Sequence, residues 1–231
     1  MDWLVAVLAV FAVLVVALWT WNVIAARIYR SRLANGYRNL ESAGEAPSHP
    51  GEVRDLMADL EECGFKPLAS HLTRDGRLVV LLFNESEGSI GEIVDFTDLE
   101  GVEHFTAEVT SILEEGRGLL CTGNTAVPSI HSGELRQTFR GAPPSELVKH
   151  HQAAIQHLRE QRLGTRSISR DEAILSREEW FERQQEQIRT APTRVIVAWI
   201  RDARGGYPAS SGRIAESETM RARLDAILES R

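Results

Sequence analysis

An uninterrupted apolar run at the amino terminus constrains this chain more than any other feature. Sixteen consecutive apolar residues extend from Trp3 to Leu18, and the segment continues with two polar interruptions to Ala26. As an ideal helix this segment would be about 36 Å long, and a bilayer's hydrocarbon core is about 30 Å thick. The sequence therefore predicts a transmembrane helix. A cleaved signal peptide is the alternative, but no lysine or arginine precedes the run, and the run exceeds a signal core in length.

Basic residues after this segment predict its orientation. Several arginines follow it closely, whereas none precedes it, so the positive-inside rule places the amino terminus outside and the remaining chain in the cytoplasm. Only 2 of the 26 lysine and arginine residues are lysine, which we interpret as a sign of a GC-rich bacterial genome. The predicted location is the bacterial inner (plasma) membrane. The residues expected at the membrane interface are Trp3, Trp19, Trp21, Arg27, Tyr29, Arg30 and Arg32.

Composition shifts divide the chain into four parts. Residues 1–40 are predicted to be the membrane anchor with its basic juxtamembrane segment. Residues 41–50 are small, polar and proline-containing, which is typical of a linker. Residues 51–202 are predicted to form a cytoplasmic α+β domain, and residues 203–231 a second linker with a carboxyl-terminal helix.

Hydrophobic periodicity predicts the elements of the central domain. Apolar residues at helical spacing indicate helices over 51–63 and 145–161, and a capping-box pattern at Ser169 and Glu172 starts a third that ends before Pro192. Short apolar or alternating segments predict strands, five of them in meander order, within residues 65–73, 78–83, 90–97, 105–113 and 119–121. The run Val195–Ile200 favours another strand. The predicted fold class is thus α+β: an N-terminal transmembrane helix followed by a mostly antiparallel sheet domain with covering helices.

Charge and cysteine content exclude several functional classes. Residues 41–115 carry 18 acidic and 4 basic side chains, and this acidity counts against nucleic-acid binding. Two cysteines, Cys63 and Cys121, are too few for a disulfide framework and lack the spacing of a zinc site.

Histidines and glycines do not form a recognisable reactive site. His150 and His157 lie about two helical turns apart, and His151 points to a different face, so one ion cannot join them directly. His151 is expected to be a packed core residue, and Cys121 a buried strand residue. The glycines match neither a phosphate loop nor a dinucleotide fingerprint. The sequence therefore assigns no catalytic, cofactor-binding or metal-binding residue.

The segment 122–144 has few apolar residues and three prolines, and it is either a functional arm or an edge strand. Its mixture of apolar and basic side chains could anchor on a partner, although packing onto the chain's own sheet is the alternative. The residues predicted to contact a partner are Leu135, Arg136, Phe139 and Arg140.

A resemblance covers less than half of the chain. The run from Gly64 to His150 contains a strand pair, Thr110-Ser111 before an acidic-glycine turn, Cys121-Thr122-Gly123-Asn124 and a Pro-Pro-Ser helix start. In these features it is similar to single-pass bacterial membrane proteins of uncharacterised function. The resemblance implies no activity and no site residue.

These patterns predict a non-catalytic accessory or scaffolding subunit of a bacterial membrane protein complex. A membrane-anchored enzyme with a dispersed active site is the alternative. The expected partners are membrane lipid and another membrane protein or complex, with no cofactor and no nucleic acid. Whether the chain forms a homo-oligomer stays open.

Overall fold

The structure is a computed structural model of the whole chain. It describes residues 3, 7, 11, 13–21, 23–24, 27, 41–42, 50–72, 78–97, 103–114, 118–125, 133–192 and 218–229.

A seven-stranded sheet forms the centre of the molecule, and its strands lie side by side in sequence order. The first six strands pair antiparallel, whereas the last pairs parallel with its neighbour. The strands are β1 (Glu41–Ser42), β2 (Lys66–Leu72), β3 (Leu78–Asn84), β4 (Ser89–Thr97), β5 (Glu103–Ile112), β6 (Leu119–Gly123) and β7 (Glu134–Thr138).

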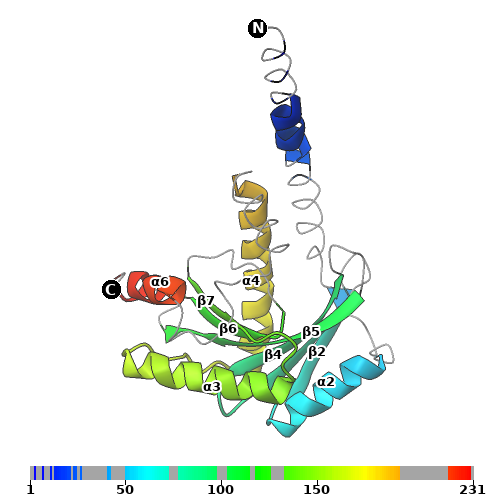
Figure 1. Ribbon diagram of the computed structural model, residues 1–231. Coiled ribbons are helices and arrows are strands. Elements are labelled where there is room, and N and C mark those ends of the chain that lie inside the picture. Colours follow the sequence, from blue (N-terminus) through cyan, green and yellow to red (C-terminus); the bar gives the residue numbers. More distant parts are fainter. Residues whose placement is uncertain are drawn as a thin grey trace.

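Helices lie on both faces of this sheet (Figure 1). Helices α2 (Gly51–Glu62) and α3 (Pro144–Glu160) cover one face. Helix α4 (Arg170–Thr190) lies on the opposite face, and α6 (Glu218–Glu229) lies beside β7 near the carboxyl terminus. The arrangement is a helix–sheet–helix stack with the sheet as its middle layer.

The alternating side chains of the strands build a separate core on each face. On the α2 and α3 side, Val80, Leu82 and Ile93 pack against Leu60 and Leu147. The same layer continues toward β7, where α6 contributes two buried side chains. This second cluster consists of Leu113, Leu120, Leu135, Ala154, Ile155, Leu158, Leu163, Leu224 and Ile227.

The core under α4 is smaller among the described residues. Val79, Leu81 and Phe83 of β3 pack there against Ile168 and Ala173. Trp180 of α4 adds a contact with β6 at Leu119 and Cys121. Since β3 supplies both clusters, it is buried on both faces as its continuous apolar sequence predicts.

The prediction of an amino-terminal transmembrane helix is wrong on the finding that no described helix is both long and apolar enough to cross a bilayer. Helix α4 has 21 residues but is rich in charged side chains.

The remaining elements of the domain agree closely with the predicted pattern. The helices expected over 51–63 and 145–161 are α2 and α3, and the five predicted strands are β2 to β6. The capping box is present, because Glu172 accepts from the Ser169 amide at 2.9 Å and Ser169 Oγ from the Glu172 amide at 3.3 Å. The segment 122–144 contains strand β7, which the meander lacked. The predicted strand Val195–Ile200 lies outside the described residues.

The outer edge of β2 carries several features that interrupt regular pairing. Pro67 has no amide hydrogen, and the register with β3 shifts between Pro67 and Ala69. Arg170, at the start of α4, donates from Nη2 to the Pro67 carbonyl at 3.2 Å. Farther along, His71 and Leu72 pair with β1.

Gly118, directly before β6, lies so close to Gly133, directly before β7, that there is no room for a side chain. A Cβ there would lie 1.8 Å from the Gly133 carbonyl oxygen, which accepts a 3.0 Å hydrogen bond from the Leu119 amide. We expect Gly118→Ala to lower the free energy of unfolding by about 1–3 kcal/mol, measured by urea denaturation. Gly141→Ala is the control, since its backbone φ is +68° but nothing lies within 4 Å of its Cβ position. A smaller loss for Gly118 than for Gly141 would contradict this account.

Candidate functional site

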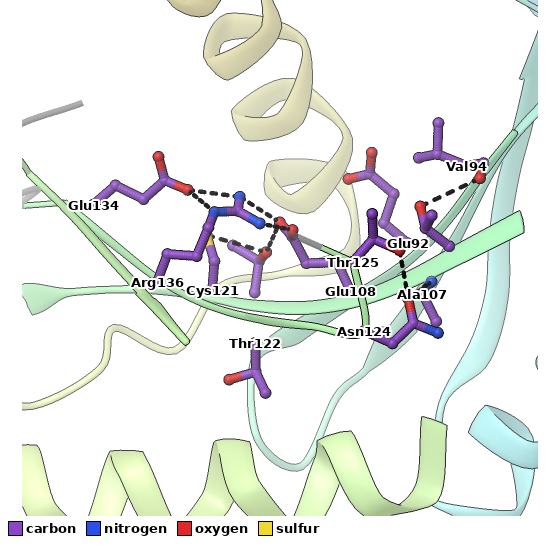
Figure 2. Close-up of polar contacts among 12 residues, drawn as sticks. Glu92, Val94, Ala107, Glu108, Cys121, Thr122, Asn124, Thr125, Glu134 and Arg136 are labelled. Atoms are coloured by element: carbon purple, nitrogen blue, oxygen red, sulfur yellow. Dashed lines mark hydrogen bonds and ion pairs between the residues drawn. The ribbon is translucent and has the colours of Figure 1, made fainter. Parts of the chain in front are cut away.

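Buried charged side chains gather on the face of the sheet that points toward α4 (Figure 2). Arg136 of β7 lies between two carboxylates. Its Nε donates to Glu134 Oε1 at 2.6 Å, and its Nη2 donates to Glu108 Oε1 at 3.2 Å, while Nη1 also pairs with Glu108. All three side chains are buried or nearly so. The guanidinium therefore holds β5 and β7 together across β6.

Strand register explains why these groups meet. Cys121 is the residue on β6 that pairs with Arg136 on one side and with Thr110 on the other. Glu108 precedes Thr110 by two residues, so it points to the same face and lies within reach of the long arginine side chain. Glu108 pairs with Gly123 of β6, which has no side chain and leaves space for the Glu108–Arg136 ion pair.

A second buried ion pair connects the sheet to α4. Arg177 of α4 pairs with Glu92 of β4, and both side chains are buried. Glu92 is also directly opposite Glu108 in the β4–β5 register, so two carboxylates face each other across neighbouring strands. Like charges in this position oppose pairing, and the two arginines offset that repulsion.

The pKa values of these carboxyls shift in opposite directions. Burial is the main cause that raises the pKa of Glu92, and Glu108 adds to it, against the opposing effect of Arg177. Burial also acts to raise the pKa of Glu108, but Arg136 outweighs it, so the pKa of Glu108 is lowered. Glu108 is therefore held as a carboxylate, whereas ionised Glu92 costs free energy in this position.

A separate polar network lies on the α3 face. His151 Nε2 is 2.8 Å from Ser111 Oγ, and its Nδ1 is 2.9 Å from Thr122 Oγ1. Gln137 Nε2 donates to Thr122 at 2.9 Å, and Ser111 Oγ is 2.8 Å from Ser89 Oγ. This chain of hydrogen bonds links α3 to four strands. As expected from the sequence, His151 is a packed core residue.

Burial determines what the His151 network can do chemically. Burial lowers the pKa of His151 to about 3, although Glu108 acts weakly in the other direction, so the ring is neutral near pH 7. A serine hydroxyl bonded to a neutral imidazole is the pairing that nucleophilic catalysis uses. Here, however, Ser111 is 1% and His151 0% exposed, so no substrate can approach Oγ in this conformation. The arrangement positions α3 instead.

Neither a metal site nor a reactive thiol is found among the described residues. No group of three or more histidine, cysteine, aspartate or glutamate side chains there could hold a metal ion. Burial raises the pKa of the Cys121 thiol well above its usual value, with Glu108 adding to the effect, so the reactive thiolate is disfavoured.

The residues predicted to contact a partner divide into two environments. Leu135 and Arg136 are buried within β7, in the core and the ion-pair network respectively. Phe139 is half-buried and stacks on His150, with ring centroids 3.7 Å apart, and Arg140 is exposed. The structure therefore places only the last two near the surface, and partner contact by any of the four stays a prediction.

The residues predicted at the membrane interface are only partly described. The side chains of Trp3, Trp19, Trp21 and Arg27 are exposed. Tyr29, Arg30 and Arg32 lie outside the described residues. Interfacial contact with lipid stays a prediction for all seven.

Sequence reasoning missed the buried carboxylates Glu92, Glu108 and Glu134, and the arginine Arg177. Only Glu92 carries a local signal, because it shares a strand face with Ile90 and Val94. Glu108 lies on the polar face of its alternating strand, and Glu134 and Arg177 lie in mostly polar segments. Their pairing depends on strand register and on the packing of α4, which no local pattern encodes.

Phe139 gives a direct test of its packing. We expect Phe139→Ala to lower the free energy of unfolding by about 1–3 kcal/mol, because the ring stacks on His150 and packs against the core cluster under α2 and α3. Thermal and urea unfolding measure this loss. Arg140→Ala is the control, since that side chain is exposed. An unchanged stability for Phe139→Ala would favour a docking role instead.

Comparisons with protein-family models, curated proteins and solved structures found no match. The partial resemblance to single-pass bacterial membrane proteins therefore stays a prediction.

Proposed function

We propose that the chain is a non-catalytic accessory or scaffolding subunit that binds another protein within a larger assembly. The observation that carries this proposal is the position of α4, whose carboxyl-terminal half projects beyond the sheet (Figure 1). Beyond Trp180, the described side chains of this helix are Arg183, Glu186 and Thr190, and all three are exposed. A projecting helix offers a surface that the domain's own core does not use.

The composition of this projecting half supports the same function. Residues 181–190 are mostly glutamine, glutamate and arginine, with two large apolar residues, Phe181 and Ile188. Arg183 and Glu179 form an exposed pair one turn apart, at 3.6 Å, which contributes little to stability. A polar helix of this kind typically extends into solvent or bridges to another domain or protein.

Site-specific crosslinking tests the proposal. A photo-reactive amino acid placed at Arg183 or Glu186 in the full chain, expressed in a bacterial host, should give one adduct of discrete mass after irradiation. The matched control positions are Gln156 and Arg159, which are exposed on α3. Adducts at the α4 positions alone support the proposal. Equal labelling at all four positions, or none at any, contradicts it.

The location of such an assembly at the bacterial inner membrane is a separate part of the proposal, and it rests on the sequence alone. Fractionation of cells that express the full chain tests it. Recovery with the inner membrane after a high-salt wash would support this location, and recovery in the soluble fraction would contradict it.

A further inference from the structure

Helix α4 is attached to the domain differently from α3. Helix α3 buries seven of its 17 residues, among them Leu147, Ile155 and Leu158. Among the α4 side chains that the structure describes, three are buried: Ala173, Arg177 and Trp180. These three lie at helical spacing on one narrow stripe. Because apolar burial supplies most of a helix's attachment, the described side chains attach α4 to the sheet at fewer points than those of α3.

The amino-terminal end of α4 is fixed by the backbone that precedes it. The Arg166 amide donates to the Ile112 carbonyl at 2.8 Å, and Leu113 bridges to Thr165. Ile168 is buried under β3, and the Ser169–Glu172 capping box then starts the helix. Residues 165–172 therefore form a root from which the helix extends.

The middle of α4 is held by a charged contact. Arg177 and Glu92 form a buried ion pair, and a pocket of about 20 Å³ remains beside it, lined in part by Thr110, Arg177 and Trp180. Buried ion pairs add little net stability because both groups lose water, but removing one partner is costly because it leaves an uncompensated buried charge. A pocket of this size has room for about one water molecule beside the ion pair. Opening would return both charged groups to water.

We infer that α4 is a releasable strap, rooted at residues 165–172 and latched over the sheet by the Arg177–Glu92 ion pair. Opening of the latch swings the helix from the sheet and exposes the face that carries Glu92, Glu108 and Arg136, while β3 to β5 and α3 stay folded. The strap does not depend on the proposed function. If that function holds, a protein that binds the projecting half of α4 can shift the equilibrium between the latched and the open position of the helix.

Hydrogen exchange of the full wild-type chain tests the strap without any substitution. The amides of α4 beyond residue 173 should exchange at least about tenfold faster than those of β3 to β5. The free energy of the local opening that permits this exchange should depend only weakly on denaturant concentration. Exchange of α4 and the sheet at one common rate, with one denaturant dependence, would overturn the inference.

Glu92→Gln tests the latch, since it removes the carboxylate charge and retains the shape of the side chain. We expect exchange of α4 to rise about tenfold, because Arg177 loses its buried counter-ion and opening hydrates it, while exchange of β3 to β5 and α3 changes less than about twofold. Arg166→Gln is the matched control, because it breaks the exposed 2.8 Å pair with Glu172 at the root and should leave α4 protected. An unchanged α4, or a uniform rise across the domain, would overturn the latch. Should Glu92→Gln not fold, the wild-type comparison decides alone.

Discussion

Arg136→Met is expected to lower the free energy of unfolding by about 3–5 kcal/mol at pH 7. The substitution keeps the length and apolar stem of the side chain but removes the charge that Glu108 and Glu134 share. Both carboxylates would then lie buried without their counter-ion, which costs much more than the intact pair contributes. Urea denaturation followed by circular dichroism measures the loss.

Two further variants separate the charge effect from packing. Arg140→Met changes an exposed arginine in the turn that follows β7 and should alter stability by less than about 0.5 kcal/mol. Combining Arg136→Met with Glu108→Gln and Glu134→Gln should recover part of the lost stability, because no unpaired charge remains. A loss below about 1 kcal/mol for Arg136→Met would show that the network is not held as described.

The second large effect is a loss of stability in acid caused by His151. Its folded pKa of about 3 lies below the 6.5 of the unfolded chain, so the unfolded state binds a proton first as the pH falls. The contribution of neutral His151 is complete above pH 6.5 and is lost progressively toward pH 3. The expected loss is about 2 kcal/mol by pH 5 and about 3 kcal/mol by pH 4.

His151→Gln isolates this contribution from that of the many carboxyls. The variant will be less stable than wild type at pH 8, because glutamine cannot bond Ser111 and Thr122 at the same two points. Its stability should nevertheless fall less steeply between pH 7 and pH 4, so the two curves converge. Parallel curves across this range would contradict a buried neutral imidazole.

Local pattern was sufficient to predict most of the domain's elements. In α3, Leu147, Ile155 and Leu158 recur at helical spacing, and the Pro143–Pro144 pair marks the start of the helix, so the helix could be predicted from sequence. Strand β3 is continuously apolar, and the Ser169–Glu172 capping box marks the start of α4 without reference to any distant residue. These signals depend on nearest neighbours along the chain.

Strand β7 shows where this reasoning fails. Its sequence Glu-Leu-Arg-Gln-Thr contains one apolar residue, yet all five residues are buried. Ion pairs with Glu108 and hydrogen bonds to Thr122 replace the apolar contacts that a strand pattern requires. Those partners lie 15 and more residues away, so the burial of Arg136 could not be predicted from its neighbours.

The edge of β2 bears on how copies of this chain behave at high concentration. An exposed, regular strand edge is a template on which another chain can add a strand, the first step toward cross-β aggregates. Pro67 withholds one donor, the register shift disturbs the spacing of its neighbours, and Arg170 occupies the Pro67 carbonyl. This edge is thereby protected against templated growth around Pro67.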